Sequence, residues 1–175
     1  MSIKNVSLRY KLIIASLISI LILAGAILVT VKVVVSNNVK QVAVKKAKSD
    51  LATGYEVIDN KYPGAWRLKN DQLYKGDTLI NNNFEIVDYI GELTGGDTVT
   101  IFANNTRVAT NVIKNGSRAV GTKVSNEVAQ TVLKEGNNFF GEADVVGHMY
   151  QTAYTPIKNN QGKIIGIWYV GASQE

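Results

Sequence analysis

Residues 12–31 form an unbroken run without a charged side chain, LIIASLISILILAGAILVTV. The run is apolar on every side of a helix, unlike an amphipathic surface helix, which keeps one polar face. Twenty helical residues span about 30 Å, the thickness of the hydrocarbon core of a bilayer. The pattern predicts a transmembrane helix over residues 12–35. The small residues Ala24, Gly25 and Ala26 leave a cleaved signal peptide as the alternative, but the apolar run continues past them.

Beyond this run, apolar residues recur at intervals of three and four, which indicates one face of a helix. We therefore expect the membrane helix to continue into a long helix over residues 36–62, ended by Tyr62, Pro63 and Gly64. Its stripe is suited to covering one face of a sheet, and the part over residues 39–51 is suited to a homodimer. The stripe consists of Val39, Ala43, Ala47, Leu51, Gly54 and Ile58.

Residues 63–173 contain short elements separated by turn residues, which is typical of an α+β domain with an antiparallel sheet. Asn83 and Ser125 are candidate helix caps, for a helix over residues 83–93 and for a second one that ends at Gly136. Strands are expected over residues 65–68, 72–74, 78–80, 98–103, 106–112, 139–146, 150–158 and 163–172.

The strands over residues 98–103 and 106–112 should form a hairpin around the turn Asn104-Asn105. A two-residue turn predicts these pairs: Phe102–Arg107, Thr100–Ala109, Ile101–Val108 and Val99–Thr110. One face would then belong to the core, with Val99, Ile101, Val108 and Val112. The other face would be mixed, with Thr100, Phe102, Arg107 and Asn111.

Two arginines accompany this hairpin, Arg107 on its second strand and Arg118 just after the turn at residues 114–117. A guanidinium matches a carboxylate in two parallel hydrogen bonds, so two of them brought close together would clamp a small anion. The alternative is that both arginines are solvated or paired with local acids such as Asp97 or Glu142.

The strand that follows residue 147 places His148, Tyr150, Thr152 and Tyr154 on one face. Polar aromatic side chains combine rigid contact area with a hydrogen-bonding group, which suits a selective pocket for a small molecule. Tyrosines are also ordinary residues of a sheet. If this face adjoins the one that bears Arg107, the two together form one cavity.

Charge is distributed unevenly along the 175 residues. The first 48 hold eight basic side chains and no acidic one, whereas from Ser49 onward eleven basic residues face fourteen acidic ones. The folded part is therefore mildly acidic, which argues against nucleic acid as a partner. The absence of cysteine excludes disulfides, thiolate metal sites and a cysteine nucleophile.

Catalytic and metal-binding patterns are weak in this sequence. His148 is the single histidine, and Glu142 with Asp144 is the one close acidic pair in the strand region, more typical of a solvated edge than of an acid–base pair. One histidine without cysteines disfavours a transition-metal site, and the spacing of a calcium loop is missing. We therefore expect no enzyme, metal or cofactor.

Five phrases, KYPGAW, KGDTLINNNFEIVDYIGELTGGDTVTIF, TRVATNV, SRAVGT and GKIIGIWYVG, resemble the single Cache sensor domain of bacterial methyl-accepting chemotaxis proteins. The resemblance covers residues 39–171 in order and spacing. It implies a PAS-like extracytoplasmic fold that binds a small molecule and passes a conformational signal through the membrane. By matched position it assigns ligand contacts to Arg107, Thr110, Arg118, Tyr150 and Tyr154, and secondarily to His148 and Thr152. Thr110 conflicts with this role, because the register above places it on the core face.

The resemblance also orients the chain, with residues 1–11 in the cytoplasm and the sensor outside the cell membrane. Basic residues on both sides of the span leave the charge rule undecided. Similar chemoreceptors continue into a second membrane helix, a HAMP relay and a methylated coiled coil. We therefore expect either the sensory piece of a longer receptor or an anchored protein that needs a partner. The ligand would be an organic acid or an amino acid. A histidine-kinase sensor and an adhesive surface protein without ligand remain alternatives.

Overall fold

The computed structural model describes residues 7–145 and 148–173. The chain divides into two compact units, Met1–Val39 and Lys40–Glu175. Helix α1 (Leu8–Lys61) contributes its first part to the first unit and its remainder to the second. The described residues of the first unit are exposed, and α1 contains a window long and apolar enough to cross a membrane.

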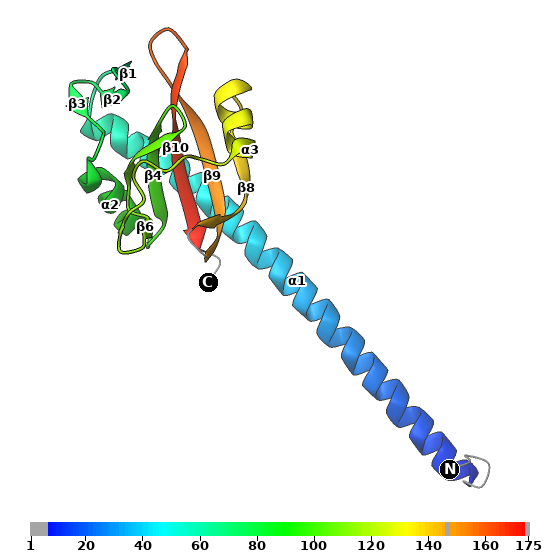
Figure 1. Ribbon diagram of the computed structural model, residues 1–175. Coiled ribbons are helices and arrows are strands. Elements are labelled where there is room, and N and C mark those ends of the chain that lie inside the picture. The colour runs from blue at the N-terminus through cyan, green and yellow to red at the C-terminus, as the bar shows by residue number, and fades with distance from the viewer. Residues whose placement is uncertain (1–6, 146–147, 174–175) are drawn as a thin grey trace. The chain divides into compact units, whose positions relative to one another are not determined.

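The second unit is built on a five-stranded antiparallel sheet with the order β5-β4-β10-β9-β8. Figure 1 shows these strands side by side, with α2 and the small β1–β3 sheet beside them. The elements after α1 are β1 (Trp66–Lys69), β2 (Gln72–Lys75), β3 (Thr78–Leu79), α2 (Phe84–Leu93), β4 (Thr98–Ala103), β5 (Thr106–Thr110), β6 (Ile113–Lys114), β7 (Ser117–Arg118), α3 (Asn126–Val128), the π-helix η2 (Ala129–Lys134), β8 (Phe139–Val145), β9 (His148–Lys158) and β10 (Ile164–Ser173). The predicted α+β class with an antiparallel sheet is confirmed.

The apolar stripe of α1 packs against one face of this sheet. Its buried members are Ala43, Ala47, Leu51, Gly54 and Ile58. The indole of Trp168, on β10, is fully buried there and its Nε1 donates a hydrogen bond to the carbonyl of Leu51 at 2.8 Å. A Cβ on Gly54 would lie 2.6 Å from the Trp168 ring, so only glycine allows this close approach.

This packing corrects the expected dimer surface over residues 39–51. Ala43, Ala47 and Leu51 are at most 6% exposed because the chain's own sheet covers them, while Val39 is 45% exposed. A stripe that is already buried inside one chain cannot serve a second copy without unfolding. Of the two uses predicted for the stripe, the structure shows the covering of the sheet.

The β4–β5 hairpin departs from the predicted register at one point. Phe102 pairs with Arg107 as predicted, but the ladder then shifts between Ile101 and Phe102, and Thr100 pairs with Thr110 instead of Ala109. A bulge explains the shift, because one extra residue in β5 rotates everything beyond it to the other face. The predicted pairs Thr100–Ala109, Ile101–Val108 and Val99–Thr110 are therefore wrong. Val112, predicted to share a core with Val99, belongs to the core cluster on the opposite face.

The helix predicted after Ser125 begins as expected, since the Ser125 hydroxyl accepts a hydrogen bond from the amide of Val128 at 3.4 Å. It then widens into the π-helix η2, which apolar spacing alone does not distinguish from an α-helix. The turn at residues 114–117 joins β6 and β7, and Asn115 and Gly116 both adopt positive φ there. Val146, the predicted end of β8, lies outside the described residues.

A polar cluster, which we call the Lys46 cluster, ties α1 to the loop between α2 and β4. The amine of Lys46 lies 2.7 Å from Asp50 Oδ2, 2.5 Å from Asp97 Oδ1 and 2.8 Å from the carbonyl of Thr94. Asp97 is only 3% exposed, and its Oδ2 has no hydrogen-bond partner among the described residues. Burial raises the pKa of Asp97 to about 6, although the amine of Lys46 works in the opposite direction.

Stability should therefore depend on pH through Asp97. Its pKa in the folded chain lies above the ordinary value of 3.8, so the folded state binds this proton more tightly than the unfolded state. The contribution of this group to the free energy of unfolding should fall as pH rises from about 4 to about 6. Urea unfolding from pH 4 to pH 7 should show this slope in the parent and lose it in Asp97→Asn. The fully exposed Asp77 gives the control variant, Asp77→Asn; equal slopes in parent and Asp97→Asn would contradict the prediction.

Candidate functional site

The face of the sheet opposite α1 carries the polar aromatic residues that the sequence analysis singled out. The bulge in β5 places Arg107 and Thr110 on this face together, opposite Phe102 and Thr100 of β4. On β9, Tyr154 pairs with Tyr169 of β10, which in turn pairs with Thr100. The face that bears Arg107 is thus continuous with the face that bears Tyr154, as predicted for a shared cavity.

A cavity of about 330 Å³ opens over this face. We call it the Arg107 cavity. Strands β5, β8 and β9 supply part of its wall, and the remainder comes from residues 111–125, a segment that we call the cover. The lining residues are Arg107, Lys114, Ala119, Thr122, Lys123, Val124, Ser125, Ala143, Val145 and Tyr154.

Arg107 is the most unusual side chain in this wall. Its guanidinium donates to the hydroxyl of Thr122 and lies over the ring of Phe102, 5.1 Å from the centroid. Its Nε is buried without a hydrogen-bond partner, and none of the described carboxylates forms an ion pair with it. Burial lowers its pKa from the ordinary value. A desolvated cation without a counter-ion is costly, and an anion in the cavity would relieve that cost.

Tyr154 brings a phenol into the same cavity. The side chain is 7% exposed and lies between two aromatic rings, with its centroid 4.6 Å from that of Tyr169 and 5.8 Å from that of Phe139. Burial raises the pKa of Tyr154 to about 12, while the nearby charge of Arg107 lowers it. The phenol therefore stays neutral at physiological pH and can donate a hydrogen bond to an acceptor in the cavity.

The charge of the wall is one-sided. Arg107, Lys114 and Lys123 are cationic, and no aspartate or glutamate is among the lining residues that the structure describes. The potential inside such a cavity is positive, and it favours a ligand that carries negative charge. With hydroxyls from Thr122 and Ser125 and apolar contact from Val124, the wall can hold a small polar anion.

Three further predicted site residues lie on the same face but do not line this cavity. The Thr110 hydroxyl is buried against the hydroxyl of Thr100 at 2.7 Å, and the Thr152 hydroxyl donates to the carbonyl of Gly141 at 2.7 Å. The ring of Tyr150 is half-buried against the core cluster on this face. His148 belongs to β9, but its side chain lies outside what the structure describes.

Arg118 is held elsewhere. Its two terminal nitrogens bind the two oxygens of Asp88 on α2, at 2.7 and 2.8 Å, and Nη1 also donates to the carbonyl of Thr110 at 2.8 Å. The guanidinium lies 4.5 Å from the ring centroid of Phe84. The predicted clamp of two adjacent arginines is therefore not formed. The partner is Asp88, since Asp97 is taken by Lys46 and Glu142 by Lys40 at 2.9 Å.

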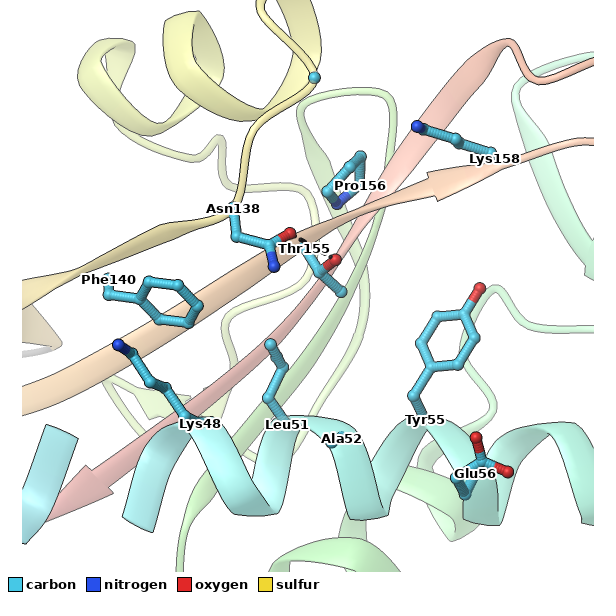
Figure 2. Close-up of a pocket in the computed structure, with 11 residues that line it drawn as sticks. Lys48, Leu51, Ala52, Tyr55, Glu56, Asn138, Phe140, Thr155, Pro156 and Lys158 are labelled. Carbon is cyan, nitrogen blue, oxygen red and sulfur yellow. Dashed lines mark hydrogen bonds between the residues drawn. The ribbon is translucent and has the colours of Figure 1, made fainter. Parts of the chain in front are cut away.

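A larger hollow of about 590 Å³ lies between α1 and the strands β8 and β9. Figure 2 shows Lys48, Leu51, Tyr55 and Glu56 rising from α1 toward residues of the strands. The amine of Lys48 lies over the ring of Phe140, 4.3 Å from the centroid. The six predicted site residues whose side chains the structure describes do not line this hollow.

The role of the cover in lining the cavity was not predicted from the sequence. Lys114, Thr122, Lys123 and Ser125 line the cavity although they lie on no predicted strand face. Strand alternation finds residues that point from a sheet, and it says nothing of a loop that folds back over that sheet. The composition of residues 111–125 does carry a sign of such a role. This polar stretch contains Lys114, Arg118 and Lys123 and no acidic residue.

Two comparisons with known proteins found a match. The chain is similar to the crystal structure of the E. coli DcuS sensor domain, with a TM-score of 0.45 and 12% sequence identity over 79% of this chain and 90% of that one. No curated protein matches the sequence. The family model described as single cache domain 3 matches residues 78–175, which include both walls of the Arg107 cavity. The chain therefore belongs to the single Cache domain 3 family.

Proposed function

We propose that the Arg107 cavity binds a small organic acid, and that the domain is the extracytoplasmic sensor of a membrane-anchored bacterial receptor of the chemoreceptor type. The observation that carries this proposal is the half-buried guanidinium of Arg107, whose Nε is buried without a hydrogen-bond partner and which has no acidic partner among the described residues. A carboxylate would complete its hydrogen bonds in a paired, charge-assisted geometry. Tyr154 and Ser125 would supply further hydrogen-bond donors to the bound acid, since the Thr122 hydroxyl already donates to the carbonyl of Ala119.

The charge of the wall favours an organic acid over an amino acid. An amino acid would bring an ammonium group next to Arg107, Lys114 and Lys123, with no carboxylate among the described wall residues to receive it. A ligand with two or more carboxylates would instead meet several cations. The volume of about 330 Å³ lies near the lower end of the range for small-molecule pockets, which fits a compact metabolite.

The anchor and the direction of signalling are part of the same proposal. The apolar window in α1 would cross the membrane once, over residues 12–35, with residues 1–11 in the cytoplasm and residues 63–173 as the exported sensor domain. Residues 36–62 continue α1, whose buried stripe follows the sheet through contacts such as Trp168 with Leu51. Binding would favour one packing of sheet on helix, and α1 would carry the change to the membrane.

The output and the assembly are open to test within this sensor class. A chemoreceptor and a histidine kinase use the same kind of input, so both are compatible with the cavity.

A homodimer through α1 would have to use its exposed side, which includes Val42, Ser49 and Ala52. Sedimentation of the full chain as a monomer in nanodiscs at high concentration would count against such a dimer.

A thermal-shift screen of the full chain in nanodiscs tests the ligand class. We expect one or more di- or tricarboxylates to raise the melting temperature of the parent by several degrees, and amino acids to have no effect. Arg107→Gln should abolish the shift and Tyr154→Phe should reduce it. Arg67→Gln is the matched control, because Arg67 is an exposed arginine paired with Asp77 far from the cavity wall.

The screen also separates the sensor from an adhesive surface protein. An adhesive protein would show no shift with any acid in the library. A shift that survives in Arg107→Gln would place the ligand elsewhere and contradict the proposed site.

A further inference from the structure

We propose that Arg118 is a positioning residue that holds the cover closed over the Arg107 cavity by tying the β6–β7 hairpin to α2. The inference rests on the proposed function, because a cover matters only if the cavity takes a ligand. It differs from the direct ligand contact that the family resemblance implies for Arg118. The tie itself is visible without ligand, so it can be tested separately.

The geometry of the tie is that of a strong ion pair. Both terminal nitrogens of Arg118 engage both oxygens of Asp88, at 2.7 and 2.8 Å, in the paired fork arrangement. A third hydrogen bond of 2.8 Å reaches the carbonyl of Thr110 at the end of β5. The ring of Phe84, at the start of α2, lies against the guanidinium. One side chain thus joins β7, α2 and β5.

The two halves of the cover are attached differently. The half after Ala119 is held by main-chain hydrogen bonds, from Gly121 to Arg107 and from Arg107 to Thr122 on β5, and from Val124 to Asn105 in the turn before it. The first half begins at Asn111, whose amide donates to the carbonyl of Val99 on β4. Beyond it, the hairpin pairs with itself, through Ile113 with Arg118 and Lys114 with Ser117, and its strands do not join the five-stranded sheet. Among the described residues of the hairpin, Arg118 is the one whose side chain is bonded to α2.

The position of Arg118 makes this tie relevant to the cavity. The next residue, Ala119, lines the cavity, as does Lys114 on the other strand of the hairpin. Releasing the guanidinium would let both wall residues move away from Arg107. The pair is also partly solvated, with side chains 29% and 41% exposed, so it can open without stranding a buried charge.

A ligand-free experiment tests the tie directly. Hydrogen–deuterium exchange of the full chain in nanodiscs should be about tenfold faster in residues 112–119 of Asp88→Asn than in the parent. Residues 121–124, bonded to β5, should keep the exchange rate of the parent. Glu85→Gln is the matched control, because it removes one negative charge from the same helix at a 74% exposed side chain. Equal exchange in Asp88→Asn and the parent would overturn the proposal.

A binding experiment separates a positioning role from a ligand contact, with succinate and citrate as probes. If Arg118 acts through Asp88, Asp88→Asn and Arg118→Gln should each raise the dissociation rate about tenfold. The double variant should then be no worse than either single variant. Weaker binding in Arg118→Gln alone, with Asp88→Asn equal to the parent, would show direct contact and overturn the proposal. Absence of binding in the parent would count against the proposed function, while the exchange experiment would still decide on the tie.

Discussion

Replacing Trp168 with alanine should lower the free energy of unfolding by about 3–5 kcal/mol. Trp168 is fully buried where α1 crosses the sheet, and its removal leaves a cavity beside Gly54 and removes the hydrogen bond to the carbonyl of Leu51. Trp168→Phe keeps most of the apolar volume and loses the hydrogen bond, so its cost should be about 1–2 kcal/mol. Urea denaturation of the full chain in nanodiscs, followed by the circular dichroism of the sheet, measures both values.

The control for this prediction is Tyr89→Ala. Tyr89 is an aromatic residue of similar size on α2, but it is 49% exposed, so its truncation should change stability by less than about 1 kcal/mol. A Trp168→Ala variant as stable as Tyr89→Ala would show that the contact between α1 and the sheet does not stabilise the domain. The proposed transmission of a signal from the sheet to α1 would then lose its physical basis.

Replacing Arg107 with methionine should have opposite effects on stability and on binding. Without ligand, the variant should be about 1 kcal/mol more stable than the parent, because an apolar side chain of similar length removes a partly desolvated charge that has no ion-pair partner among the described residues. The gain is reduced by the lost contacts with Thr122 and Phe102. Affinity for the organic acid should fall about 100-fold or more, since two charge-assisted hydrogen bonds are lost.

Thermal unfolding without ligand and calorimetric titration with the acid found in the screen measure the two effects. Arg67→Met is the matched control, because the side chain of Arg67 is 59% exposed and its loss should change neither quantity strongly. Lower stability together with unchanged affinity would show that Arg107 is a structural residue. Such a trade between stability and binding is expected where a site is built from groups that the empty protein does not satisfy.

The long helix and the sheet followed from the sequence because their signals are periodic. Spacing of three and four identified Ala43, Ala47, Leu51, Gly54 and Ile58 as one face, and all five are buried. Strand alternation placed Tyr150, Thr152 and Tyr154 on a common face, which β9 confirms through its pairing with β10. Both signals depend only on the repeat of the backbone.

The register of the β4–β5 hairpin could not be obtained in this way. A bulge changes the parity of a strand without leaving a mark in its pattern, since Val108 and Ala109 are both buried on the α1 side. The family resemblance assigned Thr110 to the ligand face, and alternation assigned it to the core. The structure shows why the two disagreed, because the bulge turns Thr110 to the face of Arg107.

The partners of the two arginines could also not be predicted from the sequence pattern. Arg107 and Arg118 are similar in sequence context, yet the first is half-buried without an acid among the described residues, and the second is paired with Asp88, thirty residues earlier in the chain. Which acid meets which arginine depends on how α2 packs beside β5. That packing is a tertiary contact, which the spacing of residues along the sequence does not predict.

The bulge in β5 also determines how this strand should respond to a change in its length. Arg107 and Thr110 are three positions apart, so in a regular strand they would lie on opposite sides, and one surplus residue brings them together. Deleting the surplus residue, Val108, would leave them two positions apart, and regular alternation would then keep both on the same side. Such a deletion should therefore change only the apolar side of the strand, where Val108 and Ala109 are both buried, and leave the polar side as it is.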